Sequence, residues 1–324
     1  MPTMRARIAT SPLASIAALP ERIWLVACYD THIVKQSAKW LLGSREHTNL
    51  TYDLTPFNRD HLAWLVAEIT GHSILSIRRY IEEVREDLEL ASHIADASRH
   101  SKRWRLADPI PRYGLRMGWY ALVRALQPKH VVETGTDKGL GACVIAAALL
   151  RNGHGRLTTI DINPDAGYLI GGRYTTVVDL RIGNSLDILP ILGDPIDLFL
   201  HEVHNSAQHE RAEYEAIDPL ITQRTVLLSD NAKTNDELAR WAEVHGHRFL
   251  YFHELPADHW YPGAGMCTAF PTLAITGRSR DEPPFADEEL LQHERCSNTR
   301  GDDDRCVPSG TGLLPRKHTD TPSR

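Results

Sequence analysis

Apolar and polar positions follow two different periods along the chain. From His130 onward, short aliphatic runs such as Val131-Val132 and Leu227-Leu228 alternate with segments of helical period. The runs predict strands at 130–134, 157–161, 175–182, 196–202, 225–230, 248–255 and 265–271, and helices fit at 140–152, 206–220 and 235–246. Strands separated by helices are typical of a doubly wound, mostly parallel α/β sheet, which binds ligands at the carboxyl ends of its strands. The last two strands lack a helix between them, which predicts an antiparallel hairpin.

Upstream of the sheet, apolar residues recur at the i, i+3, i+4, i+7 spacing and predict two helices. The first runs from Asn58, with Leu62, Leu65, Val66 and Ile69 on one face, to a stop at Gly71. The second starts at Ser73 and carries Ile77, Ile81, Val84 and Leu88 on one face. We expect both to pack on the main domain or on a partner subunit. Residues 1 to about 50 show no clear pattern and are predicted to be irregular.

The first strand of the sheet runs into a glycine-rich turn, Glu133-Thr134-Gly135-Thr136-Asp137-Lys138-Gly139, which opens a helix. Gly135 and Gly139 let the backbone pass close to a ligand because they carry no Cβ. The turn lacks the G-x-G-x-x-G spacing that seats a dinucleotide pyrophosphate. Glu133 would also repel a phosphate and suits a cationic amino-acid group. The second strand ends in Asp161, where a carboxylate can bind both ribose hydroxyls of a nucleoside.

These residues resemble motif I and the acidic motif of the class I S-adenosylmethionine (SAM)-dependent methyltransferases, whose sheet is Rossmann-like. The resemblance covers about residues 105–275. It implies that SAM is the cofactor and that a set of residues at the strand ends contacts it: Glu133, Gly135, Thr136, Gly139, Asp161, Asn184 and Ser185. After the third strand, Asn184 and Ser185 could instead only start a helix, with Ser185 as its cap.

Polar side chains follow the fourth and fifth strands where each one ends. Glu202 follows Ile196–His201, and Asp230 and Asn231 follow Val226–Ser229. Because these strand ends are neighbours in a parallel sheet, the three side chains can converge, and they offer the oxygen ligands that Mg²⁺ prefers. The alternative is that Asp230 and Asn231 cap the next helix while Glu202 faces solvent.

The segment 196–214 resembles a strand-four motif of bacterial small-molecule and sugar O-methyltransferases, and Asp230-Asn231 resembles the metal pair of catechol-type enzymes. In this sequence Glu202 replaces the usual Asp, and Asn205 replaces the usual second histidine. By position, His204 and His201 are the available catalytic bases. The loop before the last strand also resembles these enzymes. It offers His259, Trp260 and Tyr261 to cover the substrate, although Trp260 and Tyr261 could equally anchor the loop.

Composition narrows the class of protein. The chain has 324 residues, 42% hydrophobic content and a net charge of −6, which is typical of a soluble protein and argues against a nucleic-acid-binding surface. The cysteines are scattered without C-x-x-C pairs, so we expect thiols in a reducing cytoplasm, although Cys296 and Cys306 could pair under oxidation. The apolar patch at Ile23–Ala27 is too short to span a membrane.

We therefore expect a cytoplasmic SAM-dependent O-methyltransferase that acts on a hydroxyl of a small polar acceptor, a sugar or a natural product, with help from Mg²⁺ or another divalent cation. Three parts are expected: a partly helical extension at 1–104 that could mediate homo-oligomerisation, a methyltransferase domain at 105–278, and a polar, disordered tail at 279–324. The alternatives are a nucleotide-dependent oxidoreductase on a Rossmann sheet and a catalytically inactive methyltransferase-like scaffold. No nucleic-acid or membrane partner is expected.

Overall fold

The computed structural model describes residues 16, 18–46, 50–105, 110–203, 206–230 and 234–272. These residues belong to one compact unit, Met1–Leu273. The tail predicted to be disordered at 279–324 lies outside the described residues, as do His204, Asn205 and Asn231. The proposed division at residue 104 and the homo-oligomer remain predictions.

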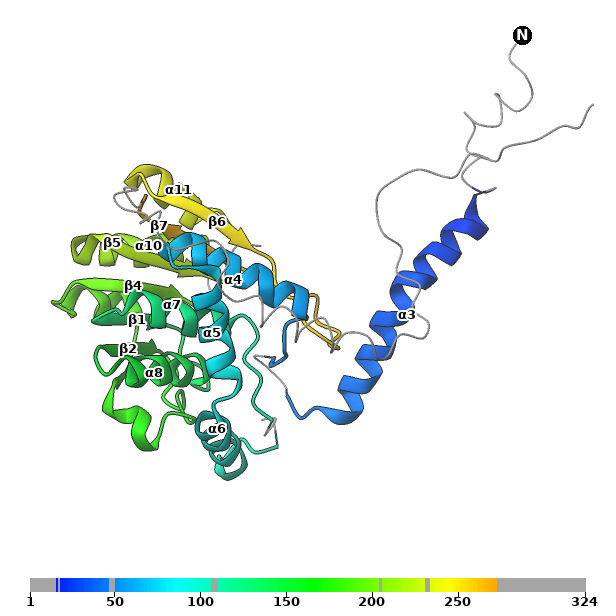
Figure 1. Ribbon diagram of the computed structural model, residues 1–324, viewed down its shortest axis with the longest axis horizontal. Coiled ribbons are helices and arrows are strands. Elements are labelled where there is room, and N and C mark those ends of the chain that lie inside the picture. The colour runs from blue at the N-terminus through cyan, green and yellow to red at the C-terminus, as the bar shows by residue number, and fades with distance from the viewer. Residues whose placement is uncertain are drawn as a thin grey trace, which may run out of the picture. The chain divides into compact units, whose positions relative to one another are not determined.

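The described strands form one mixed seven-stranded sheet in the order β3-β2-β1-β4-β5-β7-β6 (Figure 1). Neighbouring strands from β3 to β5 are parallel, and β7 runs antiparallel to both β5 and β6. The strands are β1 His130–Thr134, β2 Arg156–Asp161, β3 Val178–Ile182, β4 Ile196–His201, β5 Ile221–Ser229, β6 Arg248–Phe252 and β7 Met266–Phe270. Each predicted strand is thus found, and the antiparallel final hairpin is confirmed.

Helices cover both faces of the sheet because successive strand residues point to opposite sides. In β1, Val131 packs into a core shared with α4, α5, α7 and α8, whereas Val132 packs into a second core shared with α10 and α11. The helices are α3 Leu19–Gly43, α4 Pro56–Thr70, α5 Ile74–Arg85, α6 Leu88–His100, α7 Arg116–Leu126, α8 Leu140–Asn152, α9 Ser185–Ile188, α10 Ala207–Ile217 and α11 Glu237–His245, with 3₁₀ turns η1 Gly172–Thr176, η2 Leu189–Ile191 and η3 Asp218–Leu220.

The helix-end signals of the extension are confirmed. Gly71 ends α4 in the left-handed conformation, with φ 71°. The Ser73 side chain caps α5 by accepting a hydrogen bond from Ser76 N. The predicted second helix is too long, however, because Asp87 starts a separate helix, α6, and Leu88 is 81% exposed.

The prediction that residues 1–50 are irregular is wrong for Leu19–Gly43, which form the 25-residue helix α3. Pro20 fits the first turn of a helix, as proline often does. The apolar run Ile23–Cys28 goes all the way round this helix and gives no stripe of period 3.6, so the usual signal is missing. None of the helices in the described ranges has both the length and the apolar character needed to cross a membrane.

Two smaller expectations also need correction. The third strand begins at Val178 and not at 175, because Gly172–Thr176 form a 3₁₀ turn. The cap of α9 is Asn184, whose Oδ1 accepts from Leu186 N at 3.2 Å, and not Ser185, which is the first residue inside the helix.

Candidate functional site

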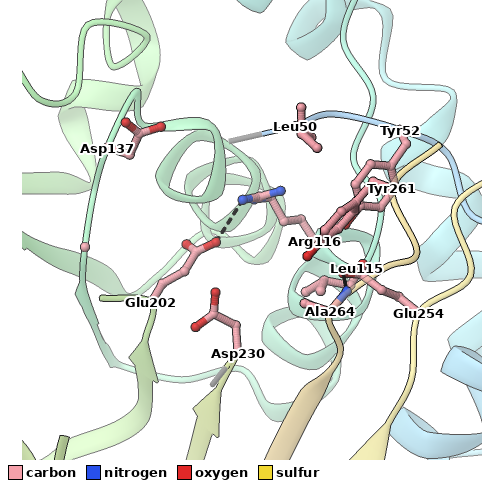
Figure 2. Close-up of a pocket in the computed structure, with 11 residues that line it drawn as sticks. Leu50, Tyr52, Leu115, Arg116, Asp137, Glu202, Asp230, Glu254, Tyr261 and Ala264 are labelled. Carbon is pink, nitrogen blue, oxygen red and sulfur yellow. Dashed lines mark hydrogen bonds and ion pairs between the residues drawn. The ribbon is translucent and has the colours of Figure 1, made fainter. Parts of the chain in front are cut away.

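Two cavities lie at the carboxyl ends of the central strands and share part of their walls. Cavity A, of about 370 Å³, is lined by Leu50, Tyr52, Leu115, Arg116, Gly135, Asp137, Glu202, Asp230, Glu254, Tyr261 and Ala264 (Figure 2). Cavity B, of about 290 Å³, is lined by Gly135, Asp137, Ile160, Asp161, Ile162, Gly183, Asn184, Ser185, Glu202, Val203 and His209. Gly135, Asp137 and Glu202 line both cavities, so one extended ligand can occupy both.

The glycines of the turn after β1 are required by close approaches to other segments. Gly135 has φ 92°, and a Cβ there would lie 2.4 Å from the Glu202 carbonyl oxygen. Gly139 has φ 89°, and a Cβ there would lie 2.9 Å from Cγ1 of Ile170. The left-handed backbone and the missing side chains let this turn pass between the ends of β2 and β4. Gly135 lines both cavities and Gly139 lines neither, and the approach of either glycine to a ligand stays a prediction.

Asp161 stands at the end of β2 on the wall of cavity B. Its Oδ2 accepts from Asp137 N at 2.7 Å, and its Oδ1 accepts from Asn163 N at 2.8 Å. Each carboxylate oxygen can accept a further hydrogen bond, so the group is oriented by the backbone while it remains able to bind hydroxyls. Asn184 and Ser185 line the same cavity. The structure therefore brings together these three predicted cofactor-binding residues.

Glu133 and Thr136 belong to the turn, but both are buried and line neither cavity. The Thr159 hydroxyl donates to Oε2 of Glu133 at 2.6 Å and lies 2.6 Å from the Thr136 hydroxyl. Burial raises the pKa of Glu133 to about 7, against the lowering effects of this hydrogen bond and of Arg116. Both residues therefore support the turn from inside, and their contact with a cofactor remains a prediction.

Glu202 and Asp230, at the ends of β4 and β5, both face cavity A (Figure 2). Oε1 of Glu202 accepts from Nη2 of Arg116 at 2.8 Å, and both side chains are largely buried. Burial raises the pKa of Glu202 well above its usual value although Arg116 opposes the shift, and burial raises the pKa of Asp230 to about 6. Oδ1 of Asp230 is buried and accepts no hydrogen bond from the described residues. The predicted convergence of these two carboxylates is therefore present in the structure.

The predicted metal site is incomplete in the part of the chain that the structure describes. Those residues contain no group of three or more His, Cys, Asp or Glu side chains placed to hold a metal ion. The third predicted ligand, Asn231, lies outside them, and Arg116 already contacts one oxygen of Glu202. Two carboxylates, one with an unbonded oxygen, fit part of a divalent-ion site.

The structure argues against His201 as the catalytic base. Its side chain is fully buried, and its Nδ1 lies 2.6 Å from Oε2 of Glu213. Burial lowers the pKa of His201, but the hydrogen bond and charge of Glu213 and the charge of Glu210 outweigh that effect and raise it. His201 lines neither cavity, so it cannot reach an acceptor bound there. The other predicted base, His204, lies outside the described residues.

Several cavity residues escaped the sequence prediction, among them Arg116, His209 and Glu254. Arg116 stands at the start of α7 within an apolar segment, and this isolated charge was a usable signal. His209 lines cavity B, where its Nε2 lies 3.2 Å from the Ser185 hydroxyl and 3.1 Å from Oε1 of Glu213. Glu254 lines cavity A from the segment after β6. Nothing local in the sequence marks His209 or Glu254.

Of the three predicted substrate-covering residues, only Tyr261 lines cavity A. The His259 and Trp260 rings pack against Trp40 of α3, with ring centroids 6.3 Å and 5.3 Å from it. These two rings therefore anchor the loop on α3. Tyr261 also packs on Tyr52, with centroids 5.7 Å apart.

Two chain segments, around residues 52–58 and 253–257, form the wall of cavity A opposite the strand ends. They are hydrogen-bonded to each other and are called the joined segments below. Thr55 N donates to Leu255 O at 3.0 Å, and Ala257 N donates to Asp53 O at 2.6 Å. The Asn58 side chain continues this contact by donating to His253 O at 2.9 Å. The joined segments present Tyr52 and Glu254 to the cavity.

Comparison with known proteins bears on the sheet and on the turn after β1. Residues 132–232 match a family model described as a methyltransferase domain. A comparison with curated protein sequences gave no match.

Several solved structures resemble the chain distantly. The O-methyltransferase TomG from Streptomyces achromogenes, solved with SAM, is 20% identical over 58% of this chain and 91% of that chain, with a TM-score of 0.43. A methyltransferase from Geobacter sulfurreducens is 19% identical over 57% of this chain and 89% of that chain, with a TM-score of 0.42. Both likenesses are too distant to bear on the site.

The family match spans β1 to the end of β5, which includes the glycine turn, Asp161 and the shared wall of the two cavities. An acidic residue at the end of the second strand, placed in a cavity beside a glycine turn, suits a nucleoside ribose. The stretch 132–232, about a third of the chain, thus resembles a methyltransferase domain.

Proposed function

We propose that this enzyme transfers the methyl group of SAM to a hydroxyl oxygen of a small polar acceptor. The observation that most directly supports this proposal is that cavities A and B meet at Gly135, Asp137 and Glu202. A nucleoside held by Asp161 in cavity B would extend its sulfonium toward this junction, with the acceptor beyond it in cavity A. Methyl transfer is an in-line displacement, so holding both reactants in line supplies much of the rate.

The charges of the junction support a cationic cofactor. Glu202 and Asp230 have raised pKa values because they are buried near other negative groups. A sulfonium close to them would favour their charged forms and would be attracted in return. In this proposal, Asp161 binds the ribose hydroxyls and Asn184 and Ser185 lie along the adenine.

Deprotonation of the acceptor hydroxyl needs a base near the junction. We assign this role to His204, which follows Glu202 closely in the sequence. A neutral histidine is a suitable base near pH 7. Asp230 and Glu202, with Asn231, would hold a divalent ion, and such an ion would lower the pKa of a hydroxyl bound to it. Arg116 would then have to share Glu202 with the ion.

The two alternative functions receive no support. The turn after β1 lacks the glycine spacing of a dinucleotide site, and the family match is to a methyltransferase domain. The acidic residue at the end of β2 is present, and the cavities are open beside it. An inactive scaffold would bind SAM without turnover, so only an activity measurement separates it from an enzyme.

The proposal is tested in two steps. Isothermal titration calorimetry should show binding of S-adenosylhomocysteine (SAH) and none of NAD. Incubation with methyl-labelled SAM and a cell extract should then give a labelled small molecule whose fragmentation places the label on oxygen. Asp161→Ala should give much less of this product at limiting SAM, and Asp165→Ala, an exposed change nearby, should behave as the wild type. Label on nitrogen, sulfur or carbon would overturn the assignment to oxygen.

A further inference from the structure

Glu254 is a buried carboxylate that the cofactor does not account for. Its side chain lines cavity A alone, and the residue is 1% exposed. Oε1 accepts from Ala264 N at 2.8 Å. Oε2 is buried, and the Tyr52 hydroxyl, which hydrogen-bonds to this carboxyl group, is the protein donor beside it among the described residues. A carboxylate offers about four acceptor positions, so Glu254 can accept a further hydrogen bond from a ligand.

The place of Glu254 separates it from the cofactor. Cavity B and the shared junction contain Asp161, Gly135 and Glu202, whereas Glu254 stands on the joined segments beyond the junction. Figure 2 shows Glu254, Tyr52 and Tyr261 on one side of the Arg116 guanidinium, with Glu202 and Asp230 on the other. A donor that meets Glu254 therefore belongs to the acceptor.

The charge of cavity A favours a cation over a neutral donor. The carboxylates on its wall are Asp137, Glu202, Asp230 and Glu254, and the one cationic side chain among its lining residues is Arg116. Arg116 pairs with Glu202, and a sulfonium or divalent ion at the junction would offset the charge of Asp230 beside it, whereas Glu254 stands beyond the junction on the other side of Arg116. An acceptor that carries a phosphate or carboxylate would be repelled.

The aromatic wall suits the same cation. The Tyr52 and Tyr261 rings are tilted by 40°, with centroids 5.7 Å apart, beside Glu254. A protonated amine within about 6 Å of a tyrosine ring centroid is attracted by the face of the ring. Burial raises the pKa of Tyr52, and the charge of Glu254 adds to that shift, so the phenol stays neutral.

We infer that Glu254, Tyr52 and Tyr261 form a subsite for a protonated amine of the acceptor, and that the acceptor is a hydroxylated amine such as an amino sugar or an amino alcohol. This inference rests on the proposed function, since it specifies what occupies cavity A. The amine binds Glu254, and its position directs a hydroxyl of the same molecule toward the junction.

The test compares two probes that differ in one group, D-glucosamine and D-glucose. Each is titrated by calorimetry into protein saturated with SAH, in EDTA so that no metal ion competes for the carboxylates. Glucosamine should bind the wild type at least tenfold more tightly than glucose. Glu254→Gln, which keeps an oxygen for Ala264 N–H, should abolish the preference and leave SAH affinity within twofold. Glu243→Gln, an exposed change in α11, should keep the preference.

Each failure has its own meaning. Wild-type protein that does not bind SAH would remove the proposed function itself. Normal SAH binding with no preference for glucosamine, or a preference that survives in Glu254→Gln, would overturn the amine subsite alone. Should Glu254→Gln fail to fold by circular dichroism, Tyr261→Leu provides the same test. It should weaken glucosamine binding several-fold and leave glucose unchanged, and equal effects on both sugars would overturn the inference.

Discussion

Replacing Asp161 by alanine should weaken SAH binding by at least tenfold. The carboxylate lines cavity B with both oxygens directed by backbone N–H groups of Asp137 and Asn163. Hydrogen bonds to a charged group contribute about 1.5–3 kcal/mol each. Loss of two such bonds corresponds to about 3 kcal/mol at the low end, or about a hundredfold, since about 1.4 kcal/mol is tenfold. Water that replaces the carboxylate recovers part of this energy, which sets tenfold as the lower bound.

Asp161→Ala also removes the acceptor for Asp137 N–H, and Asp137 has a left-handed backbone with φ 44°. The loss of affinity could therefore come from a loosened turn. An SAH analogue without ribose hydroxyls distinguishes the two causes. It should bind the wild type weakly, and Asp161→Ala should weaken it little further, because the two changes remove the same interaction.

The assay is calorimetry with SAH, and the thermal melt of each ligand-free variant checks its fold. Asp165→Ala is the matched control because its carboxylate is exposed and lines neither cavity. An SAH dissociation constant within twofold of the wild type in folded Asp161→Ala would refute the ribose assignment. A further loss with the analogue, as large as with SAH, would assign Asp161 to the turn alone.

Three further outcomes are expected. EDTA should abolish turnover and Mg²⁺ or Mn²⁺ should restore it, whereas full activity in metal-free protein would show that Arg116 alone neutralises Glu202. His204→Ala should lower kcat by about 10²–10⁴-fold with SAH affinity retained, and wild-type turnover in this variant would remove the base assignment. His201→Ala should mainly lower the melting temperature, because it removes the nearest partner of the buried Glu213. The melting temperature of ligand-free protein should fall as pH rises from about 5 to 8. The raised pKa values of Glu133 (about 7), Glu202 and Asp230 give stability that is complete below the ordinary pKa of each group and is lost as pH rises through the raised value. Glu133→Gln should reduce this dependence, and a melting temperature that rises over the same range would contradict it.

The sheet could be predicted because each strand carries its own signal. Runs such as Val131-Val132 and Leu227-Leu228 are buried on both faces of the sheet, and a continuous apolar run records that burial locally. The place of Asp161 and Gly135 on the cavity walls could be predicted for the same reason, since a position at a strand end can be counted along the chain. Helix α3 was missed because its apolar residues surround it and give no periodic stripe.

The parts of the site that were missed depend on contacts between distant segments. Arg116 and Glu202 are 86 positions apart, and no spacing rule joins them before the fold does. Glu254 faces cavity A only because residues 53–58 bond to residues 253–257. The prediction for His201 failed for the opposite reason. Its place at a strand end suggested a catalytic base, but its ring is buried and contacts Glu213 on α10.

The joined segments that carry Tyr52 and Glu254 also separate two tasks of the enzyme. The proposed cofactor half of the site stands at the ends of β1, β2, β3 and β4, whereas the far wall of cavity A stands on loops that belong to none of those strands. Substitutions in the loops can therefore alter the choice of acceptor without disturbing the cofactor half. Such an enzyme can acquire new acceptors by gradual mutation while it keeps the same methyl donor. Libraries that vary residues 50–54 and 254–264 together are therefore the natural route to change its acceptor.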